Sequence, residues 1–312
     1  MGSIIRNLIT GGAGFLGSHL VDRLMNSGEK VICLDNYCSG RKNNVIKWIS
    51  NSRFELIDHD VTIPIHIEAD RIWHLACPAA PSSYLNNPIK TSKTNFLGTY
   101  NMLELAKNIK AKLLMASTSE VYGNPEIHPQ PESYKGSVNN IGLRSCYDEG
   151  KRIAESLCFD FNRIYSNEIT IARIFNTYGP RMLPEDGRVI SNFIVQSLNN
   201  EPITIYGDGS QTRSFCYVDD LIEALILLMN SRNKGPINLG NPYECSILEL
   251  AELIRSKINP EIPLINQKLP QDDPLKRQPV IDIAKQELEW EPKISLAKGL
   301  DKTINYFRNK KG

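Results

Sequence analysis

Short apolar runs rich in β-branched residues recur along the first half of the 312-residue chain, and each one predicts a strand. Helical patterns separate most of these runs, and this alternation is typical of a doubly wound parallel α/β sheet. The expected strands are 4–10, 30–34, 54–57, 71–75, 113–118 and 170–175. Because such sheets bind ligands beyond the carboxyl ends of their strands, the residues that follow these runs are expected to share one site.

A glycine-rich turn joins the first of these strands to a helical pattern over 18–26. Gly12, Gly14 and Gly17 satisfy the G-x-G-x-x-G spacing, and Gly11 gives a wider spacing with the last two. Small residues at such a turn let the backbone approach a pyrophosphate, whose charge then lies at a helix N-terminus. The turn therefore predicts a dinucleotide site in a Rossmann-like domain.

Asp35 follows the second expected strand, at the place where a Rossmann-like domain binds the adenosine ribose. A carboxylate there accepts hydrogen bonds from the ribose hydroxyls and repels a 2′-phosphate, so it favours NAD over NADP. Arg41 and Lys42 lie close enough in sequence to weaken that preference. The alternative is that Asp35 is only a turn residue at the end of a strand.

Proline and glycine residues break the chain after residue 176 into shorter elements, which predicts a smaller, loop-rich domain. A helical pattern over 217–229 and a strand-like run over 236–239 are expected to return to the first domain. We therefore expect a Rossmann-like NAD-binding domain over 1–176, rejoined by about 215–240, and a smaller, interleaved substrate-binding domain over 177–214 and 241–312.

Charge and composition exclude several classes of partner. Lys plus Arg number 36 and Asp plus Glu 35, and the net charge of +1 provides no field for nucleic acid or an anionic membrane. The longest apolar run, 221–229, is too short to span a bilayer. Seven cysteines without a C-x-x-C pair fit a reducing compartment, and five histidines show no metal-ligand spacing. We expect a cytoplasmic protein without a bound metal.

Two short motifs supply candidate catalytic groups. Tyr147 and Lys151 are four residues apart, so in a helix they share a face, and the ammonium is expected to favour the tyrosinate. Tyr147 is thus a candidate general base, although this spacing also occurs by chance on solvated helix faces. Thr118, Ser119 and Glu120 follow one another at the end of the fifth expected strand. The alternative role for Glu120 is a structural cap or ion pair.

Taken in order, the glycine turn, Asp35, the Ser/Thr motif and Tyr-x-x-x-Lys resemble extended short-chain dehydrogenase/reductases that act on nucleotide sugars. The resemblance covers essentially the whole chain, and further matches are Asp60-Val61, His74-Leu75-Ala76, 176–180, 206–209 with Arg213, and Trp290-Glu291-Pro292. Within this family the chain looks most like the UDP-glucuronate decarboxylases, through segments 74–79, 117–123, 144–151 and 272–279. Gln278 departs slightly, since these enzymes commonly have Lys there.

The resemblance implies NAD-dependent decarboxylation of UDP-glucuronate to UDP-xylose through 4-keto intermediates. The catalytic residues that it implies are Thr118, Ser119, Glu120, Tyr147, Lys151 and Arg277. The related 4,6-dehydratases have Asp where this chain has Ser119, and that Asp protonates a departing 6-hydroxyl that a uronate does not possess. Arg277 is expected either to serve the substrate carboxylate and C5 or to bind the diphosphate.

The resemblance also implies the residues that hold the two ligands. Those expected to bind NAD are Gly11, Gly14, Phe15, Leu16, Gly17, Asp35, Asn36, Ser39, Gly40, Asp60, Val61, Leu75, Ala76, Thr94, Tyr147 and Lys151. Those expected to bind the UDP-sugar are Tyr84, Lys93, Asn176, Arg188, Tyr206, Gln211, Arg213 and Arg277. For Tyr84 and Lys93 a core or surface role is an equal alternative.

Other functions of the same fold remain open at this level. A nucleotide-sugar 4-epimerase would share Thr118, Tyr147 and Lys151, but such enzymes usually have a small or hydroxyl residue in place of Glu120. A 4,6-dehydratase is opposed by Ser119, and a silent NAD-binding sensor is opposed by the intact Tyr-Lys pair. The resemblance also implies a homodimer formed through helices over about 95–107 and 147–165.

Overall fold

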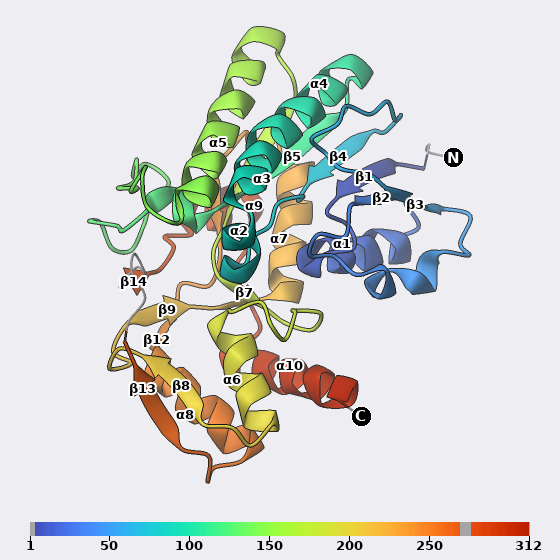
Figure 1. Ribbon diagram of the computed structural model, residues 1–312. Coiled ribbons are helices and arrows are strands. Elements are labelled where there is room, and N and C mark those ends of the chain that lie inside the picture. Colours follow the sequence, from blue (N-terminus) through green and yellow to red (C-terminus); the bar gives the residue numbers. More distant parts are fainter. Residues whose placement is uncertain (1–3, 269–275, 312) are drawn as a thin grey trace.

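The computed structural model describes residues 4–268 and 276–311, and its centre is a parallel sheet (Figure 1). Within these residues the sheet has seven strands in the order β11-β6-β5-β4-β1-β2-β3. Their bounds are β1 Arg6–Thr10, β2 Lys30–Asp35, β3 Phe54–Asp58, β4 Arg71–His74, β5 Lys112–Thr118, β6 Ile169–Ile174 and β11 Ile237–Leu239. All strands expected from the apolar runs are therefore confirmed, with ends that shift by one or two residues.

Helices cover both faces of the sheet, which makes it doubly wound as predicted (Figure 1). On one face, α1 (Phe15–Asn26) and α7 (Val218–Asn230) bury leucines against Ile9 and its neighbours. On the other, α4 (Thr99–Ile109) and α5 (Ser145–Tyr165) pack against Leu8 and its neighbours. Successive strand residues point to opposite faces, so a strand buried on both faces reads as a continuous apolar run.

The chain leaves the central sheet after β6 and returns to it with β11. Helix α7 precedes β11, the edge strand, which pairs in parallel with β6 and has Ile237 opposite Ala172. Short elements complete the upper part of the molecule: α2 (Pro81–Asn86), α3 (Pro88–Lys93), α9 (Asp282–Leu288), the 3₁₀ turns η1 (Lys42–Asn44), η2 (Ile46–Trp48) and η4 (Ser119–Tyr122), and the π-helical turn η3 (Thr94–Gly98). The division into two interleaved domains stays a prediction.

The remaining elements form a second lobe below the sheet in Figure 1. It contains the helices α6 (Val189–Leu198), α8 (Ile247–Ile258) and α10 (Leu296–Lys311) and small sheets. The strands of these sheets are β8 (Ile203–Tyr206) with β13 (Leu264–Gln267), β9 (Thr212–Ser214) between β12 (Glu244–Ser246) and β14 (Lys276–Arg277), and β7 (Thr177–Tyr178) with β10 (Cys216–Tyr217). Segment 272–275 of the decarboxylase-like motif lies outside the described residues.

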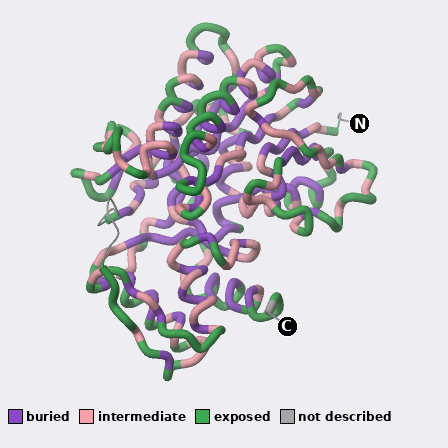
Figure 2. Tube along the Cα trace, viewed as in Figure 1, coloured by how far each residue is buried: buried purple, intermediate pink, exposed green. Residues whose placement is uncertain are grey.

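Burial follows the layers of the fold. Figure 2 shows buried residues concentrated in the sheet and on the inner faces of the helices, with exposed residues along the outer helix faces and loops. Among the residues that the structure describes, no helix combines the length and the apolar character needed to cross a membrane.

Candidate active site

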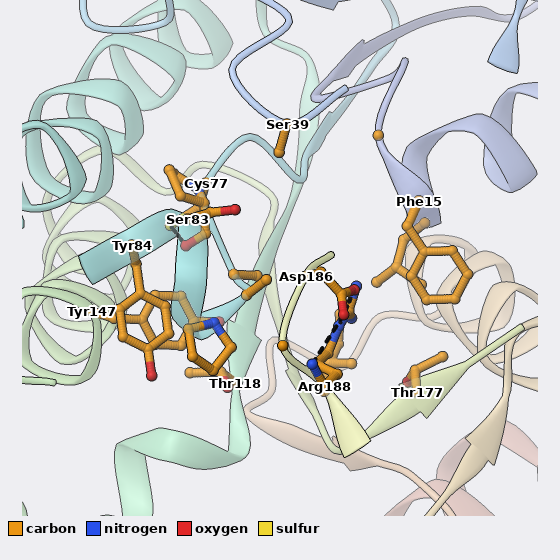
Figure 3. Close-up of a pocket in the computed structure, with 18 of the residues that line it drawn as sticks. Phe15, Ser39, Cys77, Ser83, Tyr84, Thr118, Tyr147, Thr177, Asp186 and Arg188 are labelled. Atoms are coloured by element: carbon orange, nitrogen blue, oxygen red, sulfur yellow. Dashed lines mark hydrogen bonds and ion pairs between the residues drawn. The ribbon is translucent and has the colours of Figure 1, made fainter. Parts of the chain in front are cut away.

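A cavity of about 720 Å³ opens beyond the carboxyl ends of the sheet strands and reaches the second lobe. In Figure 3, Tyr84, Tyr147 and Thr118 lie together on one side of it, and Phe15, Asp186 and Arg188 on the other. All the predicted catalytic residues line this cavity, as do the predicted ligand-binding residues except Gly40, Asp60 and Lys93. Residues from both lobes thus meet in one place.

The glycine turn lies at one end of the cavity. Gly11 has a φ of +70°, which favours glycine, and a Cβ on Gly17 would collide with the carbonyl oxygen of Gly11. Helix α1 begins directly after Gly14, and no side chain caps its first N–H groups. The free N–H groups at the start of α1 can donate to a pyrophosphate, and the glycines of the turn let a dinucleotide approach the backbone closely.

Asp35 ends β2 beside this turn. Its carboxylate accepts the N–H groups of Ala13 at 2.9 Å and Tyr37 at 2.8 Å, which fixes its orientation. Burial raises the pKa of Asp35, and these backbone donors oppose that rise. Gly40 leaves room for the carboxylate, because a Cβ there would lie 2.7 Å from Asp35 Oδ2.

The placement of two other predicted cofactor residues differs from expectation. Gly40 contacts Asp35 and does not line the cavity. Asp60 also does not line it, because its carboxylate accepts hydrogen bonds from Asn36 at 3.0 Å and Thr62 at 2.8 Å. Each residue contacts a neighbour that does line the cavity, Asp35 for Gly40 and Asn36 for Asp60, and their binding of the cofactor stays a prediction.

Tyr147 lies in the first turns of α5, with its ring stacked on Tyr84 at 5.1 Å and an interplanar angle of 8°. Burial raises the pKa of Tyr147 well above its ordinary value, and a hydrogen bond with Thr118 opposes the rise. Lys151 Nζ donates to the carbonyl oxygen of Ala116 at 2.8 Å. Lys151 thus bonds the β5 main chain, and burial is the largest influence on the pKa of Tyr147. That the ammonium favours the tyrosinate stays a prediction.

Glu120, on η4, lies between two arginines. Its Oε2 accepts from Arg144 Nη2 at 2.5 Å and from Arg277 Nη2 at 3.1 Å. Burial opposes ionisation, but the guanidinium groups of Arg277, Arg144 and Arg213 hold the pKa of Glu120 below its usual value. The side chain is therefore a partly buried carboxylate with a fixed position.

Arg277, on β14, is 1% exposed and lines the cavity. Besides Glu120, its Nη2 donates to the carbonyl oxygen of Gly123 at 2.8 Å. Within the described part of the chain, its Nε and Nη1 atoms have no hydrogen-bond partner. Buried guanidinium donors without partners are costly, and an anionic ligand in the cavity would satisfy them.

Arg144 and Asp148 belong to this cluster, but no role was assigned to them from the sequence. Arg144 Nε lies 3.8 Å from Asp148 Oδ2. Burial, followed by the charge of Glu120, raises the pKa of Asp148 to about 7. The available signal was helical spacing, since Arg144 and Asp148 are four residues apart and flank Tyr147.

The second lobe supplies the far wall of the cavity. Arg188 Nε donates to Asp186 Oδ2 at 2.7 Å, and Gln211 Nε2 donates to the carbonyl oxygen of Tyr206 at 2.6 Å. Asn176 and Arg213 also line the cavity. Lys93 is exposed at the end of α3 and does not line the cavity, whereas its neighbours Lys90 and Thr94 do.

The chain closely matches known proteins in sequence. UDP-glucuronic acid decarboxylase 3 of Arabidopsis thaliana is 58% identical over 97% of this chain and 89% of its own length. UDP-glucuronic acid decarboxylase 1 of Xenopus tropicalis is 56% identical over 97% of this chain and 72% of its own length.

Solved structures agree with this match at the level of the fold. UDP-glucose 4-epimerase of Thermotoga maritima, solved with UDP-glucose, has a TM-score of 0.90 at 29% identity and covers 99% of this chain and 100% of its own. UDP-glucuronic acid 4-epimerase of Bacillus cereus, solved with UDP-glucuronic acid and NAD, has a TM-score of 0.87 at 28% identity and covers 98% and 100%.

The model of the NAD dependent epimerase/dehydratase family matches residues 7–240, a range that contains the glycine turn, Asp35, Thr118, Tyr147 and Lys151. The protein therefore belongs to the NAD dependent epimerase/dehydratase family, the extended short-chain dehydrogenase/reductases that its motifs predict, and NAD is its cofactor.

Proposed function

We propose that this protein is a UDP-glucuronate decarboxylase that forms UDP-xylose with a retained NAD. The observation that supports this function most strongly is the cluster of Glu120, Arg277 and Arg144 beside Tyr147. It provides positive charge for a uronate carboxylate, and it has Ser119 where a second carboxylate would repel that substrate. Relatives 55–58% identical over nearly the whole chain are named for the same reaction.

The reaction begins and ends at C4 of the sugar. NAD, when bound, accepts a hydride from C4 and later returns it, so that the net redox change is zero. Tyr147 takes the proton of the 4-hydroxyl, and Thr118 holds that oxygen through its own hydroxyl. Burial raises the pKa of Tyr147, which makes its phenolate a stronger base toward the 4-hydroxyl, and the phenol returns this proton to the C4 oxygen in the last step.

The middle step breaks the bond between C5 and the carboxylate carbon. A ketone at C4 makes the substrate a β-keto acid, so carbon dioxide leaves and its bonding electrons form an enolate ending on the C4 oxygen. The hydroxyls of Tyr147 and Thr118 donate to that oxygen as its charge develops. C5 then takes a proton from a water molecule, which the ionised Glu120, held in place by its two arginines, is positioned to orient.

Arg277 binds the substrate carboxylate in this proposal. Its unpartnered Nε and Nη1 atoms suit a carboxylate, and its bond to Glu120 places it near C5 chemistry. The diphosphate and uridine are then bound by the other predicted substrate-binding residues that line the cavity, which are Asn176, Arg188, Tyr206, Gln211 and Arg213. The glycine turn and Asp35 bind the NAD pyrophosphate and adenosine ribose.

We also propose a homodimer, formed through the outer faces of η3, α4 and α5. Large apolar side chains are exposed on these elements, among them Phe96, Tyr100, Ile153 and Ile164. Exposed apolar side chains on elements that pack against one another are typical of a protein interface. All seven cysteines lie in the described residues and none is paired, which supports the proposed cytoplasmic location.

Incubating the purified protein with UDP-glucuronate and catalytic NAD tests the function. The expected result is release of carbon dioxide and a UDP-pentose identified as UDP-xylose by mass and proton NMR. UDP-galacturonate at unchanged mass would show an epimerase instead. A 4-keto-6-deoxy product from UDP-glucose would show a dehydratase, and no reaction with either sugar would leave an NAD-binding protein without this activity.

A further inference from the structure

Two carboxylates share the guanidinium group of Arg144. Glu120 bonds Arg144 Nη2 at 2.5 Å, and Asp148 Oδ2 lies 3.8 Å from Arg144 Nε. The side chains of Glu120 and Asp148 are only 16% and 11% exposed, so water screens their charges poorly. Arg277 lies on the other side of Glu120.

The hydrogen bonding of the two carboxylates is unequal. Glu120 accepts from two guanidinium groups, and its pKa is lowered. Asp148 Oδ1 is buried without a partner among the described residues, and the 3.8 Å from Asp148 Oδ2 to Arg144 Nε is too long for a hydrogen bond. Burial and the Glu120 charge raise the pKa of Asp148 to about 7, so near neutral pH this carboxyl is partly protonated.

The charge of the cluster depends on that proton. With Asp148 neutral, the charges of Glu120, Arg144 and Arg277 sum to +1, and with Asp148 ionised the four groups sum to zero. A uronate carboxylate at Arg277 therefore meets one more unit of positive charge while Asp148 is neutral than it meets when Asp148 is ionised. Arg213, which also lowers the pKa of Glu120, contributes equally in both states.

Other titratable groups around Asp148 do not reproduce this change. Those on the elements packed against it are Tyr84 of α2, Lys90 and Lys93 of α3, and Cys146, Tyr147 and Glu149 of α5. Burial raises the pKa values of Tyr84, Cys146 and Tyr147, so these groups stay neutral at pH 7. Lys90 pairs with Asp60 at 3.5 Å.

We propose that Asp148 determines specificity for an anionic sugar: the site binds the uronate carboxylate while Asp148 is protonated and loses affinity for it when Asp148 ionises. This inference deepens the proposed function and rests on it. Asp148 acts through Arg144 and the charge of the cluster and does not itself contact the sugar. A nucleotide sugar without a carboxylate is bound equally well in both states.

The test measures the affinity of the NAD-bound protein for UDP-glucuronate and UDP-xylose at pH 6.5 and pH 8.0 by calorimetry. A Tyr147→Phe background prevents turnover during the titration. From an Asp148 pKa of about 7, the Kd for UDP-glucuronate should rise about eightfold across this interval. The Kd for UDP-xylose should change less than about twofold, because neither its diphosphate diester nor its pentose titrates in this range.

Two variants in the same background identify the group responsible. Asp148→Asn is isosteric and permanently neutral, so the Kd for UDP-glucuronate should become independent of pH. Glu149→Gln removes the adjacent carboxylate, which pairs with Arg152 at 3.5 Å on the exposed side of α5, and should keep the eightfold rise.

A pH-independent Kd for UDP-glucuronate in the parent, an equal rise for UDP-xylose, or a rise that survives Asp148→Asn would each overturn the inference. Failure of the proposed function is seen separately, in the native protein, as the absence of carbon dioxide release from UDP-glucuronate.

Discussion

Asp35 illustrates how one side chain can set a ligand preference. Its carboxylate is oriented by the N–H groups of Ala13 and Tyr37, and it lies at the end of β2 beside the glycine turn. A fixed anion at this place attracts ribose hydroxyls and repels a phosphate on the same ribose. The preference for NAD over NADP therefore depends on the charge of Asp35 and not only on the size of its side chain.

Replacing Asp35 by Ala should reduce the preference for NAD over NADP at least about tenfold, which corresponds to about 1.4 kcal/mol. Fluorescence titration of the purified variant with each reduced cofactor measures this ratio. Asp58→Ala is the matched control, because Asp58 is opposite Asp35 on β3 and its side chain is 66% exposed. An unchanged ratio in Asp35→Ala would show that Asp35 only ends the strand.

At the residue scale, sequence motifs predict which residues form the site better than they predict the contacts that those residues make. Thr118, Glu120, Tyr147 and Arg277 could be identified because their spacing within short motifs resembles a family, and the structure places all four at one cavity. The bond from Lys151 to a β5 carbonyl could not be predicted, since it depends on how closely α5 approaches the sheet. The same holds for the raised pKa of Asp148, which depends on burial beside Glu120.

Helix α5 is joined to the sheet by a buried ion pair. Glu155 accepts from Arg173 Nε at 2.9 Å and Nη2 at 2.7 Å, and Ser117 Oγ donates to the same carboxylate at 2.5 Å. Ser117 lies next to Thr118 on β5, and Glu155 lies one turn after Lys151 on α5. This network sets the position of the helix that carries Tyr147 relative to the strand end that carries Thr118.

Glu155→Ala should lower the free energy of unfolding by about 3–5 kcal/mol, because it leaves the buried Arg173 without its carboxylate partner. Glu149→Ala removes an exposed ion pair with Arg152 from the same helix and should cost less than about 1 kcal/mol. Urea unfolding followed by circular dichroism measures both values. Equal costs for the two variants would mean that the buried pair contributes no more than a surface pair.

Elements of the sheet could be predicted because strands buried on both faces give continuous apolar runs, as at residues 113–118. The π-helical turn η3 has no comparable signal, since its residues continue the helical pattern of their neighbours. The pairing of β14 with β9, which places Arg277 opposite Arg213, joins segments more than sixty residues apart and requires the folded second lobe.

Large apolar side chains on η3, α4 and α5 are left exposed by the fold of the described residues. On α4 and α5, Tyr100 and Ile153 are each 42% exposed, and Phe96 on η3 is exposed to the same extent. The sequence alone indicates this surface only through family resemblance, because apolar residues on a helix face equally suit a buried core. The way in which the two lobes pack together could not be predicted from sequence patterns either, since it depends on contacts between distant segments.

A double variant, Tyr100→Glu with Ile153→Glu, should convert a dimer into a monomer, because charges would be buried at the interface. Light scattering after gel filtration should give a mass near 35.2 kDa for the variant and twice that for the native protein. Leu248→Glu with Ile265→Glu, at exposed apolar sites of the second lobe, should remain dimeric. A monomeric native protein would refute the proposed dimer.

The most direct test of the account follows the hydrogen at C4. Native protein should be incubated with UDP-glucuronate labelled with deuterium at C4, and the product analysed by mass and NMR. Because C4 is oxidised and re-reduced in one site bounded by Tyr147 and Thr118, we predict UDP-xylose that retains deuterium at C4. UDP-xylose with protium at C4, or a labelled UDP-galacturonate in its place, would contradict this account.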